Sequence, residues 1–328
     1  MKQIRIYGTL GPASGDYELL KQMFSEGMDG MRLNLSHTSL EESEDLLNAF
    51  HRAAAACGVR AALLVDMQGP ELRIGTLRAP LDLRAGDRIA ADAIPFPDAV
   101  KNALHDAEAD RELLLDDGKI LLKTDGSGRL CVVRGGTLPG RKSVALNGLS
   151  VRTPALTEED RRHIGLFRSY GVTGLMQPFV RGAEDLDAVR QALAGAGNAD
   201  IRLFAKIENA EGMAHLDSLI PCCDEIVIAR GDLGNAMPLW KLPAAQKTIA
   251  ARCSAAGRDF MVVTQMLDSM THRPVPTRAE VSDIFNAVLD GASSVMVTGE
   301  TASGEYPLET VRYLAKTVRE AETYLSVH

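Results

Sequence analysis

The sequence predicts an α/β fold, a TIM (β/α)₈ barrel with a small β-rich lid domain inserted after strand 3. Three features support this prediction. Eight short β-rich runs alternate with amphipathic helical stretches, as expected of repeated βα units that close a parallel sheet. Polar and charged residues follow these runs at their carboxyl ends, where barrel active sites are built. The apolar periodicity typical of helices stops after the third run and resumes before the fourth.

The predicted strands lie in both halves of the chain, with predicted helices between them. A barrel of this kind usually takes about 250 residues, and the 328 residues of this chain fit if one connection is expanded. The predicted strands are residues 3–9, 31–36, 61–67, 174–180, 202–208, 225–232, 260–266 and 294–300. The predicted helices are residues 16–26, 40–56, 158–170, 183–194, 244–256, 280–289 and 308–324.

The expanded connection has the pattern of a small antiparallel β domain. Apolar and polar residues alternate in LDLRAGDRIA, ELLLDDGKILLKT, RLCVVRGG and KSVALNG, with Gly or Asp-Gly turns between them. We therefore predict two domains, a catalytic barrel of residues 1–72 and 153–328 and a β-barrel-like lid of residues 73–152. Because the insert leaves from the carboxyl end of a strand, we expect it to cover the open end of the barrel.

The composition argues against several classes of partner. The net charge is −8 and no run of Lys or Arg forms a basic stripe, which disfavours nucleic acid and anionic membranes. The apolar stretch at the N-terminus is short, alternates with polar residues and ends at Gly11-Pro12, unlike a signal peptide or a membrane span. Five cysteines without a CxxC spacing favour reduced, structural thiols. We expect a cytoplasmic protein.

Oxygen donors and a cation follow the second and third predicted strands. Arg32, Asn34 and Ser36 lie at alternate positions, so their side chains point to one side of the second strand. The third strand ends in Asp66, and Met67 leads on toward the insert. We expect these groups to face one pocket at the barrel mouth.

The fifth and sixth predicted strands carry the residues best suited to a phosphorylated ligand. Lys206 and Glu208 lie two positions apart on one face, and the sixth predicted strand ends in Asp232. Two carboxylates from adjacent strands suit Mg²⁺, which completes its shell with water and substrate oxygens. Lys206 beside them is placed to neutralise a phosphoryl group in transfer. In the structural alternative, Lys206 and Glu208 form an internal ion pair and Asp232 caps a helix.

The motifs at the strand ends resemble those of the glycolytic pyruvate kinase family. Each motif alone is modest support, but eight in the family's order along essentially the whole chain are highly specific. The motifs are TLGPAS at Thr9, MRLNLSH at Met31, LLVDMQGPELRIG at Leu63, AKIENAEG at Ala205, IARGDLG at Ile228, TQMLDSM at Thr264, RPVPTRAEVSDIFNAVLDGA at Arg273 and GETASGEYPLE at Gly299.

The resemblance implies phosphoryl transfer between phosphoenolpyruvate and ADP, giving pyruvate and ATP. Arg32 would contact the transferring phosphoryl group, and Lys206 would stabilise it as the enolate oxygen departs. Backbone groups around Gly231 and Asp232, with Thr264, would seat the substrate carboxylate.

The resemblance also implies two cations, a nucleotide site and a route for a proton. Glu208 and Asp232 would hold Mg²⁺ or Mn²⁺, and Thr264 and Glu300 would lie near the carbon that gains a proton. The residues that match the family's potassium site are Asn34, Ser36, Asp66 and the backbone carbonyl of Met67. The residues that would meet the nucleotide phosphates are Asn34, His37, Arg73 and Lys142.

Several of these residues have a structural alternative that the sequence leaves open. His37 is equally suited to cap the end of a strand, and Ser36 to bond its own backbone. Glu71 is the residue type found in potassium-dependent members of the family, but it could also pair only with Arg73 across the turn.

The sequence departs from the family pattern in two regions. The insert is short, and the chain ends with the last barrel helix where the usual family chain continues into an effector-binding domain. From this we expect no effector control by that route, and a homodimer or a monomer rather than a tetramer. Three other functions stay open: the same chemistry on another enol or acid, a Mg²⁺-dependent aldolase or lyase acting on pyruvate enolates, and a non-catalytic protein that binds phosphoenolpyruvate or nucleotide.

Overall fold

The chain forms two compact units. The structure, a computed structural model, describes residues 3–105, 107–116, 118–147, 151 and 153–327. The first unit comprises Met1–Gly69, Ala155–Gly231 and Pro243–His328, and the second comprises Pro70–Pro154 and Asp232–Leu242. No helix among the described residues has both the length and the apolar run needed to cross a bilayer.

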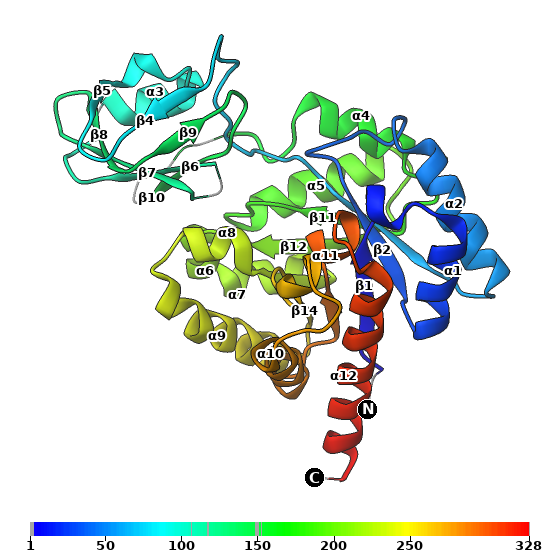
Figure 1. The fold of residues 1–328 in the computed structure, drawn as a ribbon. Coiled ribbons are helices and arrows are strands. Elements are labelled where there is room, and N and C mark those ends of the chain that lie inside the picture. The colour runs from blue at the N-terminus through cyan, green and yellow to red at the C-terminus, as the bar shows by residue number, and fades with distance from the viewer. Residues whose placement is uncertain (1–2, 106, 117, 148–150, 152, 328) are drawn as a thin grey trace. The chain divides into compact units, whose positions relative to one another are not determined.

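The first unit contains a closed barrel of eight parallel strands, which confirms the predicted fold (Figure 1). Around the barrel the order is β1, β15, β14, β13, β12, β11, β3 and β2. The strands are β1 (Arg5–Thr9), β2 (Gly30–Asn34), β3 (Ala62–Asp66), β11 (Gly174–Gln177), β12 (Arg202–Ile207), β13 (Glu225–Ala229), β14 (Asp259–Val263) and β15 (Ser294–Met296).

Helices follow the barrel strands along the chain. The C-terminal helix, red in Figure 1, packs against the first strand and the first helix, so the two ends of the barrel sequence meet. The helices are α1 (Tyr17–Glu26), α2 (Glu44–Ala56), α4 (Glu158–Leu166), α5 (Ala183–Gly195), α6 (Ala210–Ala214), α7 (Leu216–Leu219), α8 (Arg230–Asn235), α9 (Leu242–Ala255), α10 (Arg278–Leu289), α11 (Gly299–Ala302) and α12 (Pro307–Val327). Short 3-10 turns are η1 (Pro12–Ser14), η3 (Ile220–Cys222), η4 (Leu239–Lys241) and η5 (Asp268–Thr271).

Two predicted helix bounds were wrong by four residues, more than any other predicted helix bound. The helix predicted from residue 40 begins at Glu44, and residues 40–43 form turns. They do so although Ser39 and Glu42 make the reciprocal bonds of a capping box: the Ser39 N–H donates to Glu42 Oε2 at 3.0 Å and the Glu42 N–H to Ser39 Oγ at 3.1 Å. The helix predicted to residue 170 ends at Leu166 and continues as turns. In both cases apolar periodicity extends past the true end of the helix.

A mostly apolar interior fills the barrel, as expected for this fold. Phe204 of β12 is 1% exposed, and Gly174 of the neighbouring strand makes room for its ring: a Cβ on Gly174 would lie 2.7 Å from it. The side chains of this cluster are Tyr7, Leu64, Met176, Phe204, Val227, Ala229, Met261, Val263 and Met296.

Helix α10 begins with a capping box formed by Thr277 and Glu280. Removing the Thr277 hydroxyl is expected to lower the stability of the protein measurably. The Glu280 N–H donates to Thr277 Oγ1 at 3.3 Å, and the Thr277 N–H donates to Glu280 Oε2 at 2.7 Å. Thr277→Ala should lower the free energy of unfolding by about 1 kcal/mol, measured by urea denaturation. The control is Thr323→Ala, an exposed threonine near the end of α12, which should change stability by less than about 0.5 kcal/mol. Equal losses for the two variants would contradict the capping role.

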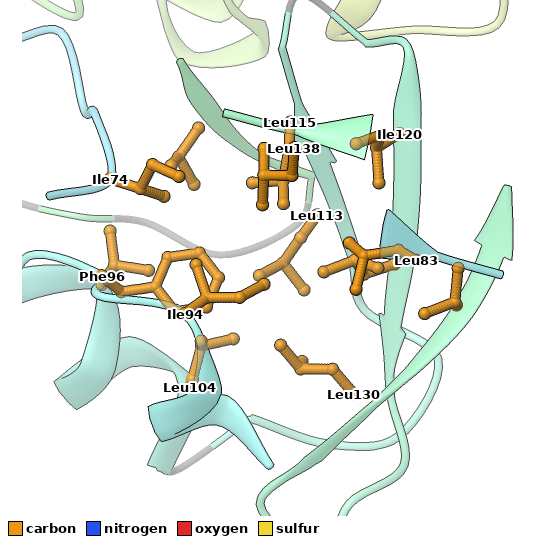
Figure 2. Close-up of a cluster of buried hydrophobic side chains, with 14 residues drawn as sticks. Ile74, Leu83, Ile94, Phe96, Leu104, Leu113, Leu115, Ile120, Leu130 and Leu138 are labelled. Atoms are coloured by element: carbon orange, nitrogen blue, oxygen red, sulfur yellow. The ribbon is translucent and has the colours of Figure 1, made fainter. Parts of the chain in front are cut away.

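The second unit is mainly antiparallel β structure around its own core. Its five-stranded sheet has the order β10, β6, β7, β8 and β5, and β4 pairs with β9 in a separate two-stranded sheet. The strands are β4 (Leu81–Leu83), β5 (Arg88–Ala90), β6 (Glu112–Leu115), β7 (Ile120–Thr124), β8 (Arg129–Arg134), β9 (Gly136–Leu138) and β10 (Val144–Asn147), and a 3-10 turn, η2, spans Ala91–Ala93. Figure 2 shows buried leucines and isoleucines of this unit, from both sheets and the loops, packed with Phe96 and Leu104.

Helix α3 (Asp98–His105), which packs on the core of the second unit, was not predicted. It buries Val100 and Leu104, four residues apart, in the core of Figure 2. This spacing is the helical signal in the sequence, but it repeats only once and is surrounded by strand-like alternation.

Candidate active site

The centre of the candidate site is a buried carboxylate that binds two cations. Asp66, the last residue of β3, is 2% exposed. Its Oδ2 accepts hydrogen bonds from Arg32 Nε at 2.8 Å and Nη2 at 2.7 Å, and from Lys206 Nζ at 3.0 Å. Arg32 comes from β2 and Lys206 from β12, so three strands contribute to one charged cluster.

The barrel register explains why these residues meet. Asn34 and Asp66 are direct partners on the parallel strands β2 and β3, and both are the last residues of their strands. Lys206 lies near the carboxyl end of β12, beside Val227 of β13. Side chains at the same end of a closed parallel barrel converge on its mouth, where active sites of this fold are found.

The two cations keep Asp66 ionised. Burial alone would raise the pKa of this carboxyl group, but the positive charges and hydrogen bonds of Lys206 and Arg32 outweigh burial and hold the pKa below its usual value. The carboxylate therefore stays negative near neutral pH and fixes the positions of both cations.

Glu208 extends the cluster as a second buried carboxylate. Its Oε1 lies 2.9 Å from Lys206 Nζ, and its Oε2 accepts a hydrogen bond from the Phe179 N–H at 2.8 Å. Phe179 has φ = 53°, an uncommon backbone conformation for a bulky residue. The ion pair that the sequence offered as a structural alternative is present, but Lys206 also contacts Asp66, so a single ammonium group lies between two carboxylates.

The oxygens around Glu208 are compatible with a hard divalent cation. Carboxylate oxygens are ligands that Mg²⁺ prefers, and both oxygens of Glu208 take part in the contacts given above. The described residues contain no group of three His, Cys, Asp or Glu side chains arranged for a metal. A site here would therefore rely on one or two carboxylates with water and substrate oxygens, as Mg²⁺ sites commonly do.

Gly231 and Thr264 lie against each other beyond β13 and β14. A Cβ on Gly231 would lie 3.2 Å from Thr264 Cγ2, so glycine permits this close approach. Thr264 directly follows β14 and has φ = 82°, and the next residue, Gln265, has φ = 54°. Asp232, the other predicted metal ligand, lies in the first turn of α8, directly after Gly231.

Glu300 accepts hydrogen bonds from backbone and hydroxyl donors. It is 2% exposed, and its Oε1 accepts from the Leu267 N–H at 3.1 Å. Its Oε2 accepts from the Thr298 N–H at 2.7 Å and from the Thr298 hydroxyl at 3.2 Å. Glu300 therefore joins the loops that follow β14 and β15.

Residues of the predicted potassium site lie together at the ends of β2 and β3. Asn34 Oδ1 accepts a hydrogen bond from the Ser36 N–H at 3.2 Å, which makes a tight turn after β2. Asn34 is beside Asp66 in the barrel register, and the Met67 N–H donates to Met176 O at 3.1 Å.

A cavity of about 860 Å³ opens beside these strands. Arg32 and two of the predicted nucleotide ligands, Asn34 and His37, line it, together with the turn that contains Gly11 and Pro12. Its lining also includes the acidic and hydroxyl side chains at the start of α2 and in the segment before it: Thr38, Glu42, Ser43 and Asp45.

The other two predicted nucleotide ligands belong to the second unit. Arg73 donates from Nε to Glu71 Oε2 at 2.9 Å and from Nη1 to the Arg141 carbonyl at 3.0 Å. The pairing of Glu71 with Arg73 across the turn is therefore present. Lys142 Nζ lies 2.7 Å from Asp116 Oδ1. A role for Arg73 and Lys142 in nucleotide binding stays a prediction.

Sequence reasoning missed one charged residue of this region, Arg230. It directly follows the wholly buried strand β13 and contacts the carbonyl of Thr264. The available signal was an arginine at the end of an apolar strand, inside the motif IARGDLG, but nothing in the sequence identified its partner.

Together these features define a (β/α)₈-barrel protein with a charged cluster of two cations and two buried carboxylates at its strand ends. The family description "Pyruvate kinase, barrel domain" matches residues 1–311. The chain belongs to the pyruvate kinase family.

Relatives from distant organisms agree with this assignment. The chain is similar to a pyruvate kinase of Leishmania mexicana, with 37% identity over 98% of this chain and 68% of the relative. It is 35% identical to a pyruvate kinase of Aeropyrum pernix, over 95% of this chain and 69% of the relative. It is also 35% identical to a pyruvate kinase of Bacillus licheniformis over 99% of this chain, but it spans only 58% of that protein's length.

Proposed function

We propose that this chain transfers the phosphoryl group of phosphoenolpyruvate to ADP, giving pyruvate and ATP. The observation that carries the proposal is that Asp66 holds Arg32 and Lys206 side by side at the barrel mouth. Phosphoryl transfer depends on fixed positive groups that match the charge spread over the equatorial oxygens. Two cations fixed by one buried carboxylate meet this requirement, and family membership supports the same reaction.

Arg32 and Lys206 would both contact the phosphoryl group, in different roles. Arg32 gives Nε and Nη2 to Asp66, and a guanidinium group has further N–H donors that can reach phosphoryl oxygens. Lys206 would donate to the phosphoryl group as the enolate oxygen leaves. Because Nζ is balanced between Asp66 and Glu208, it is positioned before the substrate arrives, which lowers the cost of reorganisation during transfer.

Glu208 and Asp232 are the proposed ligands of Mg²⁺ or Mn²⁺. When bound, the cation would neutralise negative charge on the substrate oxygens. Gly231, Asp232 and Thr264 would receive the substrate carboxylate through backbone N–H groups and the threonine hydroxyl. The contact between Gly231 and Thr264 supports this pairing.

Proton delivery to the enolate carbon is proposed for Thr264 and Glu300. Glu300 accepts from the Thr298 hydroxyl, and Thr298 lines the cavity described above. A proton would reach the carbon through water and these hydroxyl groups, with Glu300 orienting Thr298. The proposed K⁺ site lies at the neighbouring ends of β2 and β3. Its ligands would be Asn34, Ser36, Asp66 and the backbone carbonyl of Met67.

We also propose that residues 73–152 act as a lid over a nucleotide held by Asn34, His37, Arg73 and Lys142. The insert leaves from the carboxyl end of β3, where lids of barrel enzymes arise. For oligomeric state we propose a homodimer, which size-exclusion chromatography would distinguish from a monomer.

Replacing K⁺ by Na⁺ is expected to lower turnover. In a coupled assay with phosphoenolpyruvate, ADP and Mg²⁺, we expect ATP formation with K⁺ and roughly tenfold less or lower with Na⁺, equivalent to about 1.4 kcal/mol or more. The physical reason is that the oxygen donors near Asn34 and Asp66 would suit the larger cation. Equal rates with the two salts would contradict the proposed K⁺ site without contradicting the phosphoryl transfer itself.

The same assay separates the alternative functions. An aldolase or lyase acting on pyruvate enolates would form no ATP, and a binding protein would bind phosphoenolpyruvate without turnover. An enzyme for a different enol or acid would form ATP only with that substrate. ATP formation from phosphoenolpyruvate and ADP, lost in Lys206→Met, would support the proposal over all three.

A further inference from the structure

Thr264 and Gln265 adopt an unfavourable backbone conformation at the end of β14. Their φ angles are 82° and 54°, in the left-handed region where threonine, being β-branched, is a true outlier. Such a conformation is unfavourable and persists only where neighbouring groups hold the residue in place.

Arg230 is the group that holds Thr264. Its Nε and Nη2 both donate to the Thr264 carbonyl, at 3.1 and 2.7 Å, and Nη2 also lies 3.0 Å from Met266 Sδ. Its Nη1 donates to Asp283 Oδ2 of α10 at 2.6 Å. The Arg230 side chain is 12% exposed, so water competes weakly for these bonds.

The guanidinium geometry matters for this contact. Two N–H groups of one planar fork converge on a single carbonyl, while a third is directed to Asp283, which fixes the orientation of the fork. A lysine at this position would keep the charge but could not make the same set of bonds. Its three N–H donors share one nitrogen atom, whereas the donors of arginine are spread over three nitrogens in one plane.

The contact sets the relative position of two groups in the proposed carboxylate site. Gly231 is the chain neighbour of Arg230, and the Thr264 methyl group packs close to the Gly231 Cα, since even a single added Cβ there would lie 3.2 Å from the methyl carbon. Arg230 therefore ties the peptide that precedes Gly231 to the carbonyl of Thr264, from two neighbouring strand ends.

We propose that Arg230 is a positioning residue for substrate binding: by holding the strained carbonyl of Thr264, it keeps the Thr264 hydroxyl and the Gly231 backbone N–H aligned for a substrate carboxylate. Asp283 supports Arg230 in this role. The inference rests on the proposed function, because it takes the carboxylate of phosphoenolpyruvate as the ligand of Thr264 and Gly231.

The test compares Arg230 with Arg190, since each bonds an aspartate and a backbone carbonyl but only Arg230 lies at the proposed site. Arg190 bonds Asp224 at 2.7 Å and the Ile201 carbonyl at 3.4 Å, outside the proposed site. For Arg230→Lys we expect the Kd of phosphoenolpyruvate with Mg²⁺, measured by calorimetry, to rise on the order of tenfold, and the KM to rise in parallel. For Arg190→Lys both should stay within about twofold. Thermal unfolding of both variants identifies any general loss of folding.

A second variant tests the strain directly. Gln265→Gly removes the backbone penalty at a position with φ = 54°. In the double variant Arg230→Lys with Gln265→Gly, part of the lost affinity for phosphoenolpyruvate should return, because less strain has to be held. A merely structural ion pair between Arg230 and Asp283 predicts no such rescue.

The outcomes for the inference and for the proposed function are distinct. A wild-type chain that binds phosphoenolpyruvate but forms no ATP would contradict the phosphoryl transfer, and the Kd values would still decide the role of Arg230. Equal Kd values for wild type, Arg230→Lys and Arg190→Lys would overturn the inference. A wild-type chain that does not bind phosphoenolpyruvate would overturn both.

Discussion

Lys206→Met is expected to lower kcat for ATP formation by roughly 10³-fold, the loss typical of removing one essential electrostatic group from a transfer reaction. Lys206 contacts both buried carboxylates of the cluster, with Nζ 3.0 Å from Asp66 and 2.9 Å from Glu208. Under the proposed function, its loss would remove the positive charge next to the departing enolate oxygen. A coupled spectrophotometric assay measures the effect.

The matched control for this prediction is Lys247→Met. Lys247 also pairs with a carboxylate, Asp290, at 2.5 Å, but it lies more than half exposed on α9. We expect its kcat to remain within about twofold of wild type. If Lys206→Met retained wild-type kcat, the assignment of Lys206 to the phosphoryl group would be wrong.

Asp66→Asn is expected to have the largest effect on stability. The change removes the charge that balances Arg32 and Lys206 in a buried cluster, and breaking a buried ion pair on one side costs about 3–5 kcal/mol. Because the two cations are 12% and 13% exposed, we expect about 3 kcal/mol, at the lower end of that range. Urea denaturation should show a lower midpoint with an unchanged slope.

The control is a carboxylate that also lies near two arginines but is more exposed. Asp259 lies 3.6 Å from Arg5 and 3.9 Å from Arg202, with 25% of its side chain exposed. Asp259→Asn should cost less than about 1 kcal/mol. Similar losses in the two variants would contradict a special role for the cluster around Asp66.

The stability difference between wild type and Asp66→Asn should depend on pH. The positive charges of Lys206 and Arg32 outweigh burial and lower the pKa of Asp66 in the folded protein, so the unfolded chain binds this proton more readily. The contribution of Asp66 is thus fully present above its ordinary pKa of about 3.9 and is lost as pH falls toward the lower folded pKa. We expect the difference to be large at neutral pH and to shrink in acid. A difference that stayed constant down to low pH would contradict this linkage.

The strands of the barrel could be predicted because their signal is local. Buried parallel strands such as β13 are short apolar runs bounded by polar residues, and all eight were found in the sequence. Helix ends were less predictable. Residues 40–43, predicted as the start of α2, form turns although Ser39 and Glu42 make the bonds of a capping box. Helix α3 was missed because only one apolar repeat marks it.

The candidate site was predicted as a set of residues but not as a set of contacts. The spacing at strand ends pointed to Arg32, Asp66, Lys206 and Glu208, and the structure brings these four together. The Lys206–Glu208 ion pair, offered only as the structural alternative, turned out to be one part of a larger cluster.

The sequence by itself determined the eight βα units and the positions of polar residues at their ends, because periodicity and turn residues act over a few positions. Only the tertiary structure decided that Asp66 joins Lys206, 140 positions away, and that Arg230 holds Thr264, 34 positions away. Those contacts depend on the register in which the parallel strands close the barrel. That register is set by the packing of the whole core, which no single stretch of sequence contains.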